Sequence, residues 1–310
     1  MKYKNYNLVK AGIKNYNIKT FSWHLVDVCS QACLYCNEGF GSDIYRPKST
    51  FFKDKKQLES YKFVLKRLKL KSLGKFEVDL LGGEPTLHSN LFEIVENLNS
   101  IENCIEISLI TNLKKNFNYY EKFNEVKYNK LLLCPSIHMD YYNEETLSKL
   151  LKLSKLKHFK LIPIVMIHDN KKYYNEIKFL LDTLINENIE FTVSFLFDSC
   201  GYKVNYDKDF LIEMNKYAIR DNNRYTFHTD NGKKINLNKH SIYNNKLTNF
   251  NGWKCKPLRY KINHFGGIFN VCSNKPLPMT GKSECIECPH TSCLCDIQWK
   301  FDKEKHENYR

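Results

Sequence analysis

The stretch FSWHLVDVCSQACLYC, residues 21–36, joins an apolar run that predicts a β-strand to a short loop with three cysteines. Cys29, Cys33 and Cys36 follow the spacing Cys-X3-Cys-X2-Cys. Three thiolates on one tight loop can bind three irons of a cubane [4Fe–4S] cluster and leave the fourth iron without a protein ligand. An open coordination position is where a metal site acts on something other than the protein. The loop therefore predicts a catalytic centre at the end of a strand.

The twelve cysteines of the 310-residue chain are unevenly distributed. Three lie in this loop, six fall between residues 255 and 295, and the others are Cys104, Cys134 and Cys200. Such clusters would indicate disulfides in a small secreted protein, but they favour metal binding in an intracellular one. Residues 1–19 are basic and polar and do not resemble a secretory signal, and no window is apolar enough to span a membrane. We therefore expect a cytoplasmic protein.

The formal net charge of +14 is a possible sign of a nucleic-acid partner. The basic residues are scattered along a chain rich in Lys and Asn, however, and the aromatic residues do not alternate with Arg in any local pattern. This distribution favours an ordinary basic surface over a nucleic-acid-binding face.

Six apolar, β-branched runs alternate with stretches of helical periodicity. The runs cover residues 21–28, 76–81, 105–111, 131–138, 160–168 and 190–197, and the helical stretches cover 55–70, 90–98, 144–155 and 173–187, with a weaker segment at 116–127. Strands that alternate with helices predict parallel βαβ units in an α/β fold, either barrel-like or doubly wound.

Polar or reactive residues follow every predicted strand. In strand order they are Cys29, Cys33 and Cys36; Gly82 to Thr86; Thr111 and Asn112; Ser136 and His138; Met166 and His168; and Asp198 to Cys200. Functional groups of parallel α/β folds gather at the carboxyl ends of the strands. The pattern therefore predicts one site on one edge of the sheet.

The three-cysteine loop resembles the signature of the radical S-adenosylmethionine (radical SAM) enzymes, over a match that extends through residues 21–200. The resemblance implies a partial (β/α)6 barrel and a [4Fe–4S] cluster whose open iron chelates S-adenosylmethionine. It further implies that one electron cleaves this cofactor to methionine and a 5′-deoxyadenosyl radical, which abstracts hydrogen from an unactivated C–H bond. The alternative, a structural zinc loop, would need a fourth ligand nearby.

The second motif of the resemblance is Gly82-Gly83-Glu84-Pro85, which is similar to the superfamily's Gly-Gly-Glu-Pro segment. By this resemblance the glycines let the backbone offer carbonyls to the ammonium group of the cofactor. Glu84 would either hold the turn or neutralise that ammonium group. Tyr35, beside the last cysteine of the loop, belongs to the same expected cofactor site.

Asn112, Ser136 and His138 occupy strand ends where the family binds the ribose and the carboxylate of the cofactor, which polar side chains can contact directly. Each could instead be a capping residue at the edge of the sheet. Leu113 stands where the family often has Gly after Thr-Asn. His168 is a further residue that could contact substrate.

The end of the chain carries Cys255, Cys272, Cys285, Cys288, Cys293 and Cys295. The spacing Cys255-X11-Gly267-X4-Cys272 is similar to the opening half of SPASM and twitch domains, which carry auxiliary [4Fe–4S] clusters. The four later cysteines resemble the second half in compressed form, and the final separate cysteine of the SPASM pattern is missing. The resemblance implies one twitch-like cluster held by Cys255, Cys272 and two later cysteines, with a second, partly ligated cluster left open. A zinc knuckle that binds nucleic acid is the competing interpretation.

We expect three parts in the chain: a barrel at residues 1–200, a polar bridging segment at 201–250 and a small Cys-rich iron–sulfur domain at 251–310 that metal organises. Cys200 follows the sixth strand and could return a hydrogen atom to a substrate radical, as a thiol does in epimerases that resemble this group.

Families with such tails mostly modify peptides or oxidise sugar alcohols. Since the barrel begins by residue 21, without room for an N-terminal peptide-recognition domain, the resemblance implies a short peptide maturase or a carbohydrate dehydrogenase. Flavodoxin or ferredoxin would supply the electron. An iron–sulfur protein that binds or modifies nucleic acid, and a redox carrier without chemistry of its own, are the remaining alternatives.

Overall fold

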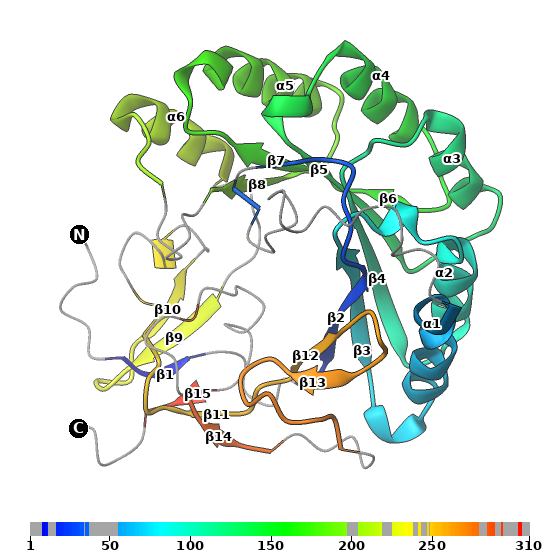
Figure 1. Ribbon diagram of the computed structural model, residues 1–310. Helices are drawn as coiled ribbons and strands as arrows, with labels where there is room; N and C mark the ends of the chain where they lie inside the picture. Colours follow the sequence, from blue (N-terminus) through cyan, green and yellow to red (C-terminus); the bar gives the residue numbers. More distant parts are fainter. Residues whose placement is uncertain are drawn as a thin grey trace.

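The computed structural model describes residues 8–11, 17–33, 35–36, 55–196, 204–218, 225–237, 241–242, 247, 249–278, 284–288, 293 and 303–305. Its larger sheet has the strand order β13-β12-β2-β3-β4-β5-β7-β8, with β6 beside β5 (Figure 1). The predicted runs correspond to β2 (Lys19–Val26), β3 (Phe76–Gly82), β4 (Cys104–Thr111), β5 (Leu131–Ile137), β6 (Lys160–Leu161), β7 (Ile164–Ile167) and β8 (Thr192–Phe195). These strands are all parallel, which confirms the predicted α/β fold.

One predicted strand, residues 160–168, is divided into β6 and β7. Pro163 lies between the two pieces and has no N–H group to donate to a strand ladder. The sheet resumes at once, because the Pro163 carbonyl accepts a hydrogen bond from the Thr192 amide at 2.8 Å.

The helices lie along the outer, convex side of the sheet (Figure 1). They are α1 (Lys55–Leu68), α2 (Leu91–Ser100), α3 (Phe117–Glu121), α4 (Glu144–Leu153), α5 (Tyr174–Asn186) and α6 (Lys208–Ala218). In α2 the buried residues Leu91, Ile94, Val95 and Leu98 have the spacing of one helix face. The weakly periodic segment 116–127 forms the short α3 followed by the 3-10 turn Lys122–Asn124.

Asparagine side chains start several of these helical segments. Asn143 Oδ1 accepts the Thr146 amide at 2.9 Å before α4, and Asn116 Oδ1 accepts the Tyr119 amide at 3.0 Å before α3. Each bond satisfies an N–H group that has no partner within the helix. The loops at the carboxyl edge of the sheet are therefore held in place where they enter the helices.

A hairpin near the end of the chain extends the same sheet. Its strands are β12 (Arg259–Ile262) and β13 (Ile268–Asn270), and β12 pairs in parallel with β2, so that Arg259 lies opposite Thr20. Tyr260 stacks on Phe21 with ring centroids 5.5 Å apart inside the main core. The hairpin therefore belongs structurally to the large sheet, while the expected division of the chain at residues 201 and 251 stays a prediction.

A second sheet has the order β10-β9-β1-β15-β11-β14. It combines β1 (Leu8–Ala11) from the start of the chain with β9 (Tyr225–Thr229), β10 (Lys234–Leu237), β11 (Lys254–Cys255), β14 (Ile286–Glu287) and β15 (Lys303–Glu304). Figure 1 shows these strands across the open side of the curved large sheet. Within the described part of the chain, no helix has the length and apolar character to cross a membrane.

Candidate active site

The three-cysteine loop, residues 29–36, follows the carboxyl end of β2 as predicted. Cys33 is buried, and Cys29 and Cys36 are partly exposed. The Cys36 amide donates a hydrogen bond to the Cys33 carbonyl at 3.1 Å, which closes a turn between these two cysteines. Residue 34 and residues 37–54 lie outside the described ranges.

The glycine motif, residues 82–85, holds the first part of this loop. The Gly83 amide donates to the Val26 carbonyl at 2.8 Å, and the Glu84 amide donates to the Val28 carbonyl at 2.7 Å. A Cβ atom on Gly82 would lie 2.2 Å from the Val26 oxygen, and one on Gly83 would lie 1.9 Å from the Val28 oxygen. Only glycine fits at both positions. The glycines are thus explained by the close approach of two backbone segments.

The Glu84 carboxylate is fully engaged within the protein. It accepts hydrogen bonds from the Thr86 amide and hydroxyl at 3.0 and 2.6 Å, from the Thr111 hydroxyl at 2.7 Å and from the Asn112 amide at 2.7 Å. Burial raises the pKa of Glu84, which is 1% exposed, although the four donors lower it. These bonds correspond to the first of the two roles considered for Glu84, holding the turn. They tie the end of β3 to the end of β4.

Asn112, at the end of β4, reaches the loop from the other side. Its Nδ2 atom lies 3.6 Å from Cys29 Sγ and 3.1 Å from Ser30 Oγ. Its Oδ1 atom accepts the Lys114 amide at 3.1 Å. The Gln31 amide also donates to Cys29 Sγ, at 3.4 Å. The Cys29 sulfur therefore faces two N–H donors.

The later part of the loop is held by residues that follow β5. The Tyr141 hydroxyl accepts the Ala32 amide at 2.8 Å, and the Tyr35 hydroxyl lies 3.1 Å from His138 Nδ1. The Tyr35 ring stacks on His138 and meets the edge of His168, with centroids 5.6 and 5.4 Å apart. Burial lowers the pKa of His138 to about 4, so this ring is neutral near pH 7.

Two residues of this edge were missed by the sequence prediction. Tyr141 contacts the loop, and Asp140 accepts a hydrogen bond from the Tyr173 hydroxyl at 2.6 Å and lies 3.6 Å from His168 Nε2. The signal was available, because both residues closely follow the fourth predicted strand, where functional groups are expected. Ser136, which was predicted, lies in β5 opposite Ile164 and is partly exposed.

The chemistry of the loop fits an iron–sulfur cluster. Burial, together with the neighbouring Cys29 and Cys36 thiols, raises the pKa of Cys33 to about 12, and burial also raises the pKa of Cys29. Such thiols stay protonated until a bound cation displaces their protons. The two N–H donors at Cys29 are suited to a thiolate acceptor. The three side chains can thus hold three irons, each with its own thiolate.

No group of three or more His, Cys, Asp or Glu side chains among the described residues is arranged to hold a single metal ion. Cluster ligands meet a different requirement, because each cysteine binds a separate iron and the sulfurs need not converge on one point.

A polar pocket of about 390 Å³ adjoins the loop. It is lined by Gln31, Asn112, Leu113, Lys114, Asp140, Tyr141, Tyr142, Asn143, Glu145, Thr146 and Lys149. Lys149 Nζ donates to the carbonyls of Leu113 and Lys115 at 3.0 and 2.7 Å, so this cation fixes the wall of the pocket. The pocket joins the three-cysteine loop to the loops that follow β4 and β5.

The predicted ligands in the tail are distributed differently. Cys255, Cys288 and Cys293 are buried in one small cluster of side chains that includes Phe227 and Phe250. Cys272 follows β13, and Cys285 is exposed. Cys200 and Cys295 lie outside the described residues. None of the ten described cysteines forms a disulfide.

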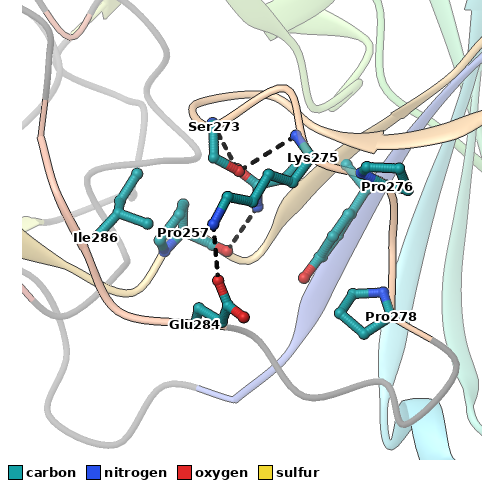
Figure 2. A pocket seen from close by; sticks show the side chains of 9 residues that line it. Pro257, Ser273, Lys275, Pro276, Pro278, Glu284 and Ile286 are labelled. Carbon is teal, nitrogen blue, oxygen red and sulfur yellow. Dashed lines mark hydrogen bonds and ion pairs between the residues drawn. The ribbon is translucent and has the colours of Figure 1, made fainter.

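The turn that carries Cys272 borders a second pocket, of about 230 Å³ (Figure 2). Asn270 Oδ1 accepts the amides of Cys272 and Ser273 at 3.0 and 3.1 Å, and its Nδ2 donates to the Pro257 carbonyl at 3.0 Å. Lys275 and Glu284 form an ion pair of 3.2 Å across this pocket, as Figure 2 shows. Asn270 thereby links the turn of Cys272 to the segment just after Cys255.

The three-cysteine loop and the turn of Cys272 lie at opposite ends of β2. The Val271 amide, next to Cys272, donates a hydrogen bond to the carbonyl of Arg259, and Arg259 pairs with Thr20 near the start of β2. Cys29, in contrast, follows the end of β2. The eight residues of β2 span about 26 Å at roughly 3.3 Å per residue.

Comparison with solved structures gives matches at low identity. The structure of native anSMEcpe with bound AdoMet is 16% identical, covers 85% of this chain and 78% of that chain, and has a TM-score of 0.48. A hexahistidine-tagged anSMEcpe with bound AdoMet is 15% identical over 85% of this chain and 75% of that chain, with a TM-score of 0.49. BtrN in complex with AdoMet and 2-DOIA is 14% identical, covers 81% of this chain and 72% of that chain, and has a TM-score of 0.35.

No curated protein matches the sequence. The sequence model of the radical SAM superfamily, in contrast, matches residues 23–197, a range that runs from β2 through β8 and contains the three-cysteine loop and the glycine motif. More than half of the 310 residues fall within this match. The chain belongs to the radical SAM superfamily.

Proposed function

We propose that this chain cleaves S-adenosylmethionine at the three-cysteine loop and uses the resulting radical to abstract hydrogen from an unactivated C–H bond of a peptide. Members of the superfamily are enzymes, and the family implies a [4Fe–4S] cluster and S-adenosylmethionine. A cluster bound here would supply the electron that cleaves the cofactor to methionine and a 5′-deoxyadenosyl radical. The observation that carries the proposal is the loop itself, which the ends of β3, β4 and β5 hold in place.

Each group of residues has a defined task in this proposal. Cys29, Cys33 and Cys36 bind three irons. The backbone of the glycine motif, fixed against residues 26–28, would accept the ammonium group of the cofactor, and the engagement of the Glu84 side chain within the protein supports this assignment to the backbone. Tyr35 and His138 provide a stacked pair of rings beside the loop that can orient the adenosyl part.

Peptide modification, by epimerisation, cross-linking or oxidation, is the substrate class that we propose for this oxidoreductase of the maturase type. The polar pocket beside the loop supports a substrate that forms several hydrogen bonds, as a peptide backbone does. Flavodoxin or ferredoxin is the proposed electron donor. Cys200 is the proposed hydrogen-atom donor for an epimerisation, and the cysteines of the tail are the proposed ligands of an auxiliary iron–sulfur cluster.

The test is anaerobic reconstitution followed by an assay for 5′-deoxyadenosine with a chemical reductant. We expect cofactor cleavage by the wild type and none by Cys33→Ala. The matched control is Cys104→Ala, which removes another buried thiol remote from the loop and should keep full cleavage. Cleavage by Cys33→Ala at the wild-type rate would refute the proposed site.

Iron content separates the proposed clusters. About four irons per chain correspond to the loop alone, and about eight add one auxiliary cluster. Peptide and sugar-alcohol libraries then test the substrate class, because the correct class should raise 5′-deoxyadenosine formation. Stimulation by sugar alcohols alone would overturn the peptide assignment. Cys200→Ala should retain cofactor cleavage and lose the epimerised product.

A further inference from the structure

Both polar atoms of the Asn112 side chain, Nδ2 and Oδ1, form hydrogen bonds within the protein. Its Nδ2 atom donates to Cys29 Sγ at 3.6 Å and to Ser30 Oγ at 3.1 Å, and its Oδ1 atom accepts the Lys114 amide at 3.1 Å. An amide group has two N–H donors. Both are therefore directed at the start of the three-cysteine loop.

The backbone of Asn112 is fixed as firmly as its side chain. Its amide donates to the buried Glu84 carboxylate at 2.7 Å, and the preceding Thr111 hydroxyl donates to the same carboxylate. Leu113, the next residue, adopts a φ of 58° and has its carbonyl held by Lys149 Nζ. These backbone contacts on both sides of Asn112 hold its side-chain amide toward the Cys29 sulfur.

We propose that Asn112 is a positioning residue that holds Cys29 and raises the reduction potential of the cluster bound at the loop. This inference rests on the proposed function. A hydrogen bond to a ligand sulfur stabilises the reduced cluster more than the oxidised one, because the reduced cluster places more negative charge on its sulfurs. The bond is only partly exposed to water, so its electrostatic effect is little screened. Asn112 thereby makes the first electron transfer easier.

The experiment is a redox titration of the reconstituted full-length protein, monitored by electron paramagnetic resonance. Adding S-adenosylmethionine identifies the relevant signal, since only the cluster with the open iron changes its spectrum. Asn112→Leu should shift the midpoint potential of that signal to a more negative value. Asn112→Asp, which keeps the shape but replaces the donor with a negative charge, should shift it further. An unchanged potential in both variants overturns the inference.

A matched control is Asn116→Leu, a substitution in the same connection between β4 and α3. Asn116 caps α3 through its bond to the Tyr119 amide, so its loss should lower stability without moving the potential. An equal shift in this control would mean that the effect of Asn112 is merely structural, which contradicts the inference.

A second measurement covers the case in which Asn112→Leu fails to load iron. Wild-type protein labelled with 15N-asparagine should show a nitrogen coupling to the reduced cluster, and Asn112→Asp labelled in the same way should lack it. Absence of the coupling in the wild type also overturns the inference. If the wild type itself binds no cluster at the loop, the proposed function fails instead, so the two failures are distinguishable.

Discussion

The three-cysteine loop and the Cys-rich tail are built in different ways. The loop follows a central strand of the large sheet, and hydrogen bonds from the ends of β3, β4 and β5 fix it along its length. The tail depends on β11, β14 and β15, which have two residues each, and three of its cysteines lie within a small core of their own. The loop region is therefore held by the large sheet, whereas Cys255, Cys288 and Cys293 are held by short strands and a small core.

From this difference we expect the proposed clusters to contribute unequally to the stability of the two regions. Short strands and a small core bury little apolar surface, so the proposed auxiliary cluster would contribute most to the stability of the tail. The loop region is supported by a core that extends from Phe21 to Leu184 and beyond. The predictions below test this contrast.

Loss of the Glu84 carboxylate should have the largest effect on the loop region. Glu84→Ala leaves four donors without their acceptor, two of them backbone amides, in a buried place. We expect the free energy of unfolding of the apoprotein to fall by about 4 kcal/mol, measured by urea denaturation. The exposed Glu102→Ala is the control and should change it by less than about 0.5 kcal/mol. A loss below about 1 kcal/mol for Glu84→Ala would show that the carboxylate does not organise the site.

Iron removal should affect the tail more than the large sheet. The amides of Cys288 and Gly252, which join β14 to the turn before β11, should exchange hydrogen roughly a hundredfold faster in the apoprotein than in the reconstituted protein. Amides of β3 and β4 should change little. Cys288→Ala should abolish the protection by iron, whereas the equally buried Cys134→Ala should not. If the amides of the tail exchanged as slowly as those of β3 and β4 in the apoprotein, the proposed difference between the two regions would be wrong.

Much of the fold was predictable because local patterns and tertiary packing agree. The apolar runs are the buried strands, and polar residues after β2, β3, β4, β5 and β7 meet at one edge, as the geometry of parallel strands requires. Residues 198–200 lie outside the described ranges. The β12–β13 hairpin was not predicted to join the large sheet, since pairing between Arg259 and Thr20, which are far apart in the sequence, leaves no signal in either segment.

The sequence indicated which residues lie near the three-cysteine loop, but it indicated less well what each of them contacts. Glycines at positions 82 and 83 were expected to approach a ligand, and the structure shows that they first make room for the carbonyls of Val26 and Val28. Asn112 was expected to contact the cofactor, which stays a prediction, and its side chain also contacts Cys29 and Ser30. Such roles depend on distances between loops, which a sequence pattern does not contain.

The stability of the loop region should depend on pH through His88, which ends the turn after Glu84. Burial lowers the pKa of His88 to about 4 from 6.5, and its Nδ1 accepts the Asn90 amide at 3.1 Å. The unfolded chain therefore binds a proton between pH 6.5 and 4 that the folded chain does not, so stability falls as the pH falls through this window. From pH 7 to pH 5 the loss from His88 is about 2 kcal/mol.

The measurement compares urea denaturation of the apoprotein with that of His88→Gln at both pH values. The variant lacks the titrating ring. The free energy of unfolding of the wild type minus that of the variant should therefore be about 2 kcal/mol smaller at pH 5 than at pH 7. His138, whose pKa burial also lowers, is common to both proteins and cancels from the difference. Parallel pH curves would mean that His88 is protonated in the folded state.

The difference between the Ala and Gly substitutions of Leu113 should be the smallest of these effects on the free energy of unfolding. The order of stability of Ala and Gly should be reversed there relative to an ordinary strand position. Leu113 is 3% exposed, and its φ of 58° lies in the left-handed region that glycine adopts freely. Leu113→Ala and Leu113→Gly both remove the buried side chain, but only Gly relieves the backbone strain, so we expect Gly to be more stable than Ala by about 1 kcal/mol. At Leu109, buried in β4, Ala should instead be more stable than Gly by roughly 0.5–1 kcal/mol. If urea denaturation shows Ala to be the more stable substitution at both positions, the turn beside Cys29 is relaxed, and the large core holds the loop region without strain.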